Sequence, residues 1–271
     1  MTTPDSPGTG SARPLAVVTG ASSGIGLELA KQFAEHDFDL VVAAEDAGIE
    51  VAADVLRSFG AAVTPAQVDL STYEGCEQLV ELVRAAGRPV EALALNAGVG
   101  SGGPFDETDL RKELEVIAVN VTSTVHLAKR FIPSMVERRS GKVLITSSIA
   151  STQPGPYEAV YAASKAFDQS FAESIRSELK DTGVTVTSLM PGPTDTEFFE
   201  RAEMEDTRLG QSKKDDPAKV AKLGFEALMA GKDRVVASSL RTKAQEATAK
   251  VMPDRAKAKM HSKMAEPGGG E

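Results

Sequence analysis

The chain has few of the residues that mark secreted or membrane-spanning proteins. Its 271 residues include a single cysteine, Cys76, and no tryptophan. One cysteine cannot form an internal disulfide, and no run approaches the roughly 18 apolar residues that a membrane-spanning helix needs. Residues 1–13 are small and polar and hold two prolines, without the apolar stretch of a secretory signal. We therefore expect a protein of the reducing cytoplasm with no membrane segment.

Basic residues and histidines are also scarce. The formal net charge is -9 and the isoelectric point is near 5.1, which argues against a nucleic-acid surface. The three histidines, His36, His126 and His261, are too scattered for a metal site, and each falls in a helical stretch, where a solvated or packed imidazole is more common. We predict neither a metal nor a nucleic-acid partner.

Short aliphatic runs alternate with amphipathic segments along most of the chain. Ile25, Leu29 and Phe33 illustrate the fourfold spacing of these segments, each long enough for a crossover helix between parallel strands. Such alternation predicts an α/β fold with a doubly wound, Rossmann-like parallel sheet. Seven strands are expected, at residues 15–19, 40–44, 62–68, 92–95, 143–146, 184–190 and 234–237.

The composition changes at both ends of this pattern. We interpret residues 1–13 as a disordered leader, 14–239 as one domain and 240–271 as a basic helical extension. Residues 239–264 hold seven Lys or Arg against two acids, and Pro253 separates two apolar stripes. We expect an element that is solvated or contacts another subunit, ending in frayed glycines. The stripes are Leu240, Ala244, Ala247 and Val251, then Ala256, Met260 and Met264.

Three glycines, Gly20, Gly24 and Gly26, follow the first predicted strand and open the first helix. A pyrophosphate needs bare backbone and a helix N-terminus at such a place, although the glycines can also serve only a tight turn. About twenty positions further on, Glu45 and Asp46 can bond the ribose hydroxyls of NAD and repel the extra phosphate of NADP. The alternative is a solvated helix cap. We favour NAD over NADP.

Tyr161 and Lys165 stand four positions apart, hence on one helix face. A tyrosine with an ordinary pKa of about 10 needs about 4 kcal/mol of phenolate stabilisation to act as a base near neutrality, and the charge of Lys165 can supply it. Ser148, thirteen residues before Tyr161, can hydrogen-bond a substrate oxygen, with Ser147 as the alternative. Asn120 in an apolar helix also needs an explanation.

The Gly-x-x-x-Gly-x-Gly turn and the Tyr-x-x-x-Lys pair resemble those of the short-chain dehydrogenase/reductase family, over roughly residues 15–239. The resemblance implies an NAD(P)-dependent oxidoreductase that interconverts an alcohol and a ketone or aldehyde by hydride transfer. Tyr161 is then the acid/base, Lys165 its electrostatic helper and Ser148 the anchor of the substrate oxygen. Asn120 corresponds to the family asparagine that holds a water on the proton path to Lys165. The helices that hold Asn120 and Tyr161 form subunit interfaces in relatives, which implies a homodimer or homotetramer.

The resemblance also assigns the cofactor contacts. Asp69 matches the residue that contacts the adenine ring, although an Asp before Ser71 can equally make a turn. Asn96 begins an Asn-Ala-Gly that lines the cleft, with Leu95 in place of the first Asn of the family motif. In the loop at 191–196, which holds the nicotinamide carboxamide, Thr194 replaces the usual valine. The full set is Gly20, Ser22, Ser23, Gly24, Ile25, Gly26, Glu45, Asp69, Leu70, Asn96, Ala97, Gly98, Tyr161, Lys165, Pro191, Gly192, Thr194 and Thr196.

Three loops beyond the strand ends are expected to contact a small-molecule substrate: residues 98–105, 149–156 and 194–210. Their apolar side chains favour a hydrophobic alcohol or ketone over a sugar. Side chains that pack a lid against its own body would give the same pattern. The side chains are Phe105, Ile149, Phe198, Phe199 and Met204.

Two other functions compete with this interpretation. Residues 20–24 satisfy Gly-x-Ser-x-Gly, the nucleophile elbow of hydrolases, but His126 lies in a helical segment and His261 in the basic tail, where neither suits a triad. A non-catalytic nicotinamide-binding sensor or scaffold is the second alternative. The joint presence of Tyr161, Lys165 and Ser148 with Asn120 argues against it.

Overall fold

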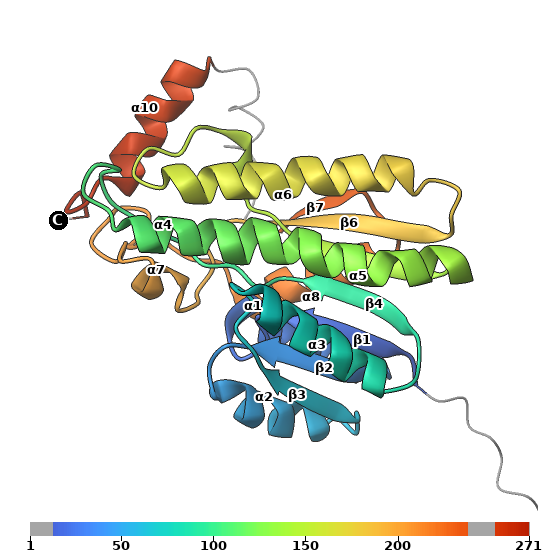
Figure 1. The fold of residues 1–271 in the computed structure, drawn as a ribbon. Helices are drawn as coiled ribbons and strands as arrows, with labels where there is room; N and C mark the ends of the chain where they lie inside the picture. Colours follow the sequence, from blue (N-terminus) through green and yellow to red (C-terminus); the bar gives the residue numbers. More distant parts are fainter. Residues whose placement is uncertain (1–12, 238–252, 271) are drawn as a thin grey trace, which may run out of the picture.

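A computed structural model describes residues 13–237 and 253–270. It contains a seven-stranded parallel sheet in the order β3-β2-β1-β4-β5-β6-β7 (Figure 1). The predicted doubly wound, seven-stranded sheet is confirmed, and each expected strand is present with ends that differ by two residues at most. The strands are β1 (Leu15–Thr19), β2 (Asp39–Ala44), β3 (Val63–Gln67), β4 (Val90–Leu95), β5 (Gly141–Thr146), β6 (Val184–Pro191) and β7 (Arg234–Ala237).

Helices cover both faces of the sheet (Figure 1). One apolar core packs α1, α2 and α8 against the sheet, and a second packs α3, α5 and α6 against the opposite face. The described helices are α1 (Gly24–Glu35), α2 (Gly48–Arg57), α3 (Tyr73–Ala85), α4 (Leu110–Val116), the π-helix η1 (Ile117–Thr122), α5 (Ser123–Arg138), the 3-10 helix η2 (Ile149–Thr152), α6 (Ala159–Glu178), α7 (Phe198–Arg201), α8 (Pro217–Met229) and α10 (Asp254–Ala265). None of these described helices is long and apolar enough to cross a membrane.

The central strands are near-continuous apolar runs because both of their faces are buried. All residues of β1 and β2 are buried. On one face, Phe33 of α1 meets Phe38 and Phe225 edge-on, with ring centroids 5.2 and 5.1 Å away. Strand order reverses between β1 and β4, and this switch point is where the carboxyl ends of the strands leave a crevice for a ligand.

The C-terminal helix α10 packs on the domain itself. Ala265 is buried in an apolar cluster with Phe199 and Met204, and the backbone amide of Leu209 donates to the carbonyl of Met264 over 2.8 Å. The few apolar side chains of α10 thus pack against residues 198–209, while most of its other residues are partly or fully exposed. The solvated or subunit-contacting role of this helix stays a prediction. Residues 1–12 of the predicted leader (1–13) and the stripe at 240–251 lie outside the described residues, whereas Arg13 is described and donates to the Gly60 carbonyl over 2.8 Å.

The glycines after α10 are also bonded, although the sequence predicts a frayed end. The Gly268 amide donates to the Asp206 carboxylate over 2.7 Å, and the Gly270 amide donates to the Asp206 carbonyl over 2.9 Å. Arg208 donates to the Gly269 carbonyl over 2.7 Å. The segment 253–270 is therefore attached to the loop at 204–211 by side-chain and backbone hydrogen bonds.

Candidate active site

A cavity of about 410 Å³ opens at the carboxyl ends of the central strands, within the usual size of a small-molecule site. All the sequence-predicted site residues line it except Asn120. Of the five apolar side chains expected around the substrate, Ile149, Phe198 and Phe199 line the cavity. Phe105 is exposed instead, and Met204 is buried in the cluster under α10. The fold thus brings residues from distant parts of the chain to one place.

The glycine turn has a shape that only glycine allows. Gly20 and Gly24 have φ angles of +65° and +55°, in the left-handed region that disfavours side chains. A Cβ added to Gly26 would overlap the carbonyl oxygen of Gly20. No side chain caps α1 at Ser23, so the positive N-terminus of this helix faces the cavity together with bare backbone. This arrangement fits a pyrophosphate.

The two acids after β2 differ in their contacts. Asp46 accepts a hydrogen bond from Ser22 over 2.7 Å and another from the Gly48 amide over 2.9 Å. Asp46 therefore binds the first backbone amide of α2, although Ala47 is the N-cap residue and no side chain caps this helix. Glu45 is exposed at the cavity wall, with its side chain available to a ribose. Asp69 accepts from the Ser71 amide over 2.8 Å, so it makes the turn and lines the cavity as well.

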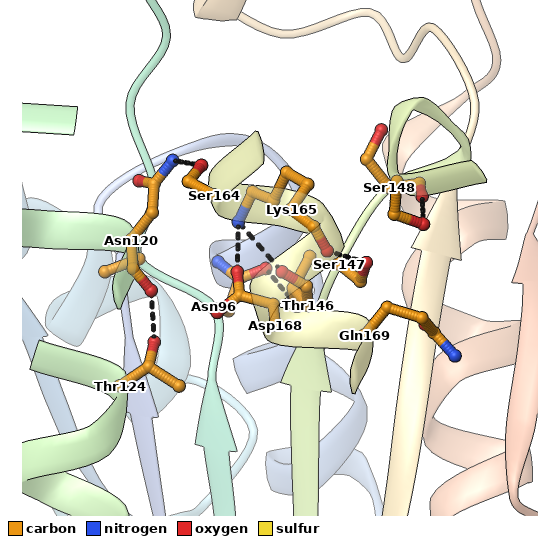
Figure 2. A network of polar contacts seen from close by, with 12 residues as sticks. Asn96, Asn120, Thr124, Thr146, Ser147, Ser148, Ser164, Lys165, Asp168 and Gln169 are labelled. Atoms are coloured by element: carbon orange, nitrogen blue, oxygen red, sulfur yellow. Dashed lines mark hydrogen bonds and ion pairs between the residues drawn. The ribbon is translucent and has the colours of Figure 1, made fainter. Parts of the chain in front are cut away.

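The structure separates the two serines at the end of β5. Ser147 is buried and donates its hydroxyl to the Lys165 carbonyl over 2.9 Å. Ser148 lines the cavity, and its hydroxyl accepts from the Ala150 amide over 3.1 Å and is hydrogen-bonded to Tyr161. Figure 2 shows both serines beside α6. The Ser148 hydroxyl therefore lies beside Tyr161 at the cavity, whereas the Ser147 hydroxyl joins β5 to α6.

Tyr161 is half-buried at the cavity wall, and its ring lies against that of Phe198 at a centroid distance of 5.0 Å. Burial raises the pKa of Tyr161 above its ordinary value near 10, and the carboxylates of Glu158 and Asp168 add to this rise, while the Ser148 hydrogen bond opposes it. The protein's own groups thus hold the phenol protonated. Lys165 is not among the groups that shift this pKa, and its ammonium is paired with Asp168; its role as electrostatic helper stays a prediction.

Asn120 does not line the cavity, and its burial has a structural explanation. It lies in η1, where its side chain accepts from the Val99 amide over 2.9 Å and donates to the Val99 carbonyl over 3.0 Å. Its amide also donates to Ser164 over 2.9 Å. These contacts join the loop after β4 to α6. The water relay toward Lys165 stays a prediction.

Three residues that the sequence interpretation missed lie on the cavity wall: Gln153, Glu158 and His261. The His261 ring is 2.8 Å from the Glu158 carboxylate and 3.2 Å from the Gln153 amide. Glu158 stands three positions before Tyr161, a helical spacing that could have marked it. His261 carries no such signal, because only the tertiary fold brings α10 to this wall. Within the described residues no cluster of three or more His, Cys, Asp or Glu could hold a metal ion.

A glycine turn at the switch point of a parallel sheet, with serine, tyrosine and lysine beyond it, defines a Rossmann-like protein with an oxidoreductase-type site. Residues 14–207 match the sequence model of the short chain dehydrogenase family, and the chain belongs to this family.

One similar protein is retinol dehydrogenase 8 of Bos taurus, 36% identical over 190 residues that make up 67% of this chain and 59% of that protein. The chain thus spans less than two thirds of this relative. A solved short-chain dehydrogenase/reductase of Burkholderia phymatum in complex with NAD has a TM-score of 0.79 and 27% identity, with 88% of this chain and 92% of that chain covered. A short-chain dehydrogenase of Sphingobium yanoikuyae in complex with NADPH has a TM-score of 0.76 and 26% identity, with 88% and 93% covered.

Proposed function

We propose that the protein is an NAD(P)-dependent oxidoreductase that interconverts an alcohol and a ketone or aldehyde on a hydrophobic small molecule. One observation carries this proposal: Ser148, Tyr161 and Lys165 meet in the same cavity as the glycine turn. A proton donor, an oxygen anchor and an anion-binding helix N-terminus are what coupled proton and hydride transfer to a carbonyl requires.

Different residues around the cavity would bind the cofactor, orient the substrate and transfer the proton. A bound nicotinamide cofactor would supply or accept the hydride. The turn at Gly20–Gly26 would hold its pyrophosphate on the α1 N-terminus, and the loop at 191–196 would hold its carboxamide. Ser148 would orient the substrate oxygen by a hydrogen bond, and Tyr161 would give a proton to that oxygen during carbonyl reduction. The raised pKa of the Tyr161 phenol keeps its proton available for this transfer.

For the cofactor we propose NAD over NADP. The carboxylates of Glu45 and Asp46 both line the cavity beyond β2, where a negative charge opposes the extra phosphate of NADP. Asp46 is hydrogen-bonded to Ser22 and to the Gly48 amide, so Glu45 is the acid that we assign to the ribose. The two solved relatives named above hold NAD in one case and NADPH in the other. Dissociation constants for NADH and NADPH, measured in parallel by nicotinamide fluorescence, test this preference directly.

A reduction screen across aldehydes and ketones of increasing apolar size, with NADH and NADPH in parallel, tests the reaction. We expect turnover with apolar carbonyl compounds, and a rate lower by about 10²–10⁴ in Tyr161→Phe, the usual contribution of a positioned proton donor, with cofactor affinity kept. A non-catalytic sensor would bind the cofactor but show no turnover, and no effect of Tyr161→Phe. Turnover that survives this substitution unchanged would contradict our assignment of the acid.

We also propose a homo-oligomer in the cytoplasm, formed through exposed apolar side chains on α4, η1 and α6. Leu110, Leu114 and Ile117 are 69%, 54% and 41% exposed, and Phe167 is 39% exposed. Exposed apolar side chains on neighbouring helices suit a subunit contact. Light scattering on the purified chain measures the oligomeric state.

The single cysteine is buried, and burial raises its pKa to about 11, so Cys76 stays an unreactive thiol.

A further inference from the structure

Lys165 makes two contacts that its assigned role does not require. Its ammonium nitrogen lies 2.9 Å from the carbonyl oxygen of Thr146, the last residue of β5, and 3.0 Å from a carboxylate oxygen of Asp168. Figure 2 shows the three residues together at the end of the strand. An ammonium has three N–H donors, so these two partners leave one for a ligand in the cavity.

Asp168 is an unusual residue at this place. It is 1% exposed, and one of its carboxylate oxygens has no hydrogen-bond partner among the described residues. Burial raises the pKa of this carboxyl, and the charge of Lys165 opposes the rise. A buried ion pair adds little net stability compared with apolar residues of the same size. The stability of α6 therefore does not account for Asp168.

The pair also determines where the lysine head group lies. A Cβ added to Gly98 would be 3.2 Å from the Lys165 nitrogen and 3.4 Å from the Asn120 side-chain oxygen. The ammonium is thus confined between the Thr146 carbonyl, the Asp168 carboxylate and the backbone of the Asn-Ala-Gly segment, at the wall of the cavity. A lysine side chain is otherwise long and flexible.

Resting on the proposed function, we propose that Asp168 is a positioning residue that holds the Lys165 ammonium against β5 and offsets its charge, so that Tyr161 serves as a proton donor. Asp168 of α6 and Glu158, the residue before α6, are the carboxylates that act on the phenol, and Lys165 of α6 is paired with Asp168. Without the aspartate, the positive charge of Lys165 would act on Tyr161 unopposed and favour the phenolate.

Other charged groups face the same place from two further elements. His261 of α10 is hydrogen-bonded to Glu158. Glu197 and Arg201 line the cavity beside Phe198, where they form an exposed ion pair with each other. These groups are the same in every Asp168 variant, so a change in the titration of Tyr161 reports the removed carboxylate.

Two substitutions separate the two parts of the proposal. Asp168→Asn removes the charge and keeps a carbonyl oxygen that can accept from the ammonium. Asp168→Leu removes the acceptor as well. Glu178→Gln is the control, because it removes one negative charge from an exposed position on the same helix. Melting temperatures establish that each variant is folded before the other measurements.

The first measurement needs no turnover. Replacement of Tyr161 by a ring-fluorinated tyrosine brings the phenol's own pKa into a range in which proteins are folded, and fluorine NMR follows its ionisation against pH. We expect Asp168→Asn to lower the midpoint by about one pH unit, the lower end of what a neighbouring charge does. Glu178→Gln should leave it in place. An unchanged midpoint in Asp168→Asn overturns the charge-offsetting role.

The second measurement is cofactor affinity from nicotinamide fluorescence. We expect Asp168→Asn to keep the dissociation constant within about threefold, and Asp168→Leu to raise it about tenfold because the lysine is no longer held. An unchanged constant in Asp168→Leu overturns the positioning role, and an Asp168→Asn variant that does not fold makes the pair a structural requirement and overturns the proposal. If no carbonyl compound is reduced by the unmodified chain, the proposed function fails separately, because neither measurement uses turnover.

Discussion

The two serines at the end of β5 offer a matched pair of substitutions, Ser148→Ala and Ser147→Ala. The two residues are adjacent, chemically identical and both at the cavity, yet the Ser147 hydroxyl is bonded to the Lys165 carbonyl while the Ser148 hydroxyl is bonded to Tyr161. The Ser148 oxygen accepts from the Ala150 amide, and its hydroxyl, which is hydrogen-bonded to Tyr161 in this structure, can donate to a substrate oxygen in the cavity. Loss of one such donor to a developing negative charge lowers the turnover rate by about 10²–10³.

The effect of Ser147→Ala should be on stability. Its hydroxyl bonds the Lys165 carbonyl inside the protein, 2% exposed. Removal of one buried hydrogen bond costs about 1 kcal/mol, which lowers the melting temperature of a chain of this size by about 2–4 °C. We expect its turnover rate to stay within about tenfold of the unmodified chain.

Steady-state kinetics with the best carbonyl substrate from the screen, together with melting curves, measure both effects. Cofactor dissociation constants should be equal in the two variants, because neither serine is assigned to the cofactor. A hundredfold loss of turnover in Ser147→Ala with near-normal turnover in Ser148→Ala would refute the assignment. Equal losses in both would show that the geometry of this strand end does not discriminate between the two hydroxyls.

Two further predictions concern the cofactor turn and the C-terminal helix. Gly26→Ala should weaken cofactor binding by more than about a hundredfold. The new Cβ would overlap the Gly20 carbonyl oxygen and lie 2.6 Å from the Asn96 side-chain nitrogen. Fluorescence titration with NADH measures this loss of affinity. His261→Ala should raise the KM of the carbonyl substrate about tenfold through loss of hydrogen bonds that hold α10 at the cavity, with cofactor affinity kept. Hydrogen exchange at the Leu209 amide, which bonds the Met264 carbonyl, should become faster in His261→Ala.

Each of these two substitutions has a matched control substitution elsewhere in the chain. Gly87→Ala places a methyl group where nothing lies within 4 Å, so it should cost stability through its left-handed backbone but leave cofactor binding unchanged. Lys259→Ala changes an exposed side chain of α10 and should leave KM and exchange as they are. Normal cofactor binding in Gly26→Ala, or an unchanged KM in His261→Ala, would contradict the respective interpretation.

The sequence by itself determined the sheet, because aliphatic runs separated by amphipathic helices have few ways to bury their apolar faces. It also determined the glycine turn and the Tyr161–Lys165 pair, since these depend on local spacing: a turn of seven residues and one helical turn. Side chains at such short separations are brought together by the backbone alone. The same reasoning favoured Ser148 and kept Ser147 as an alternative. The contacts of two adjacent hydroxyl groups at the end of a strand depend on the elements packed around them, which local spacing does not reveal.

The tertiary structure alone decided which charges surround Tyr161. Asp168 pairs with the ammonium of Lys165, and the carboxylates of Glu158 and Asp168 both raise the pKa of Tyr161. The tertiary structure also places α10 so that His261 is hydrogen-bonded to Glu158, which lies 103 positions earlier in the sequence. The sequence of a basic, mostly polar helix has no hydrophobic pattern from which its packing partner could be predicted. Burial and pairing depend on elements that the chain brings together only when it is folded, and they determine the protonation state on which the proposed chemistry depends.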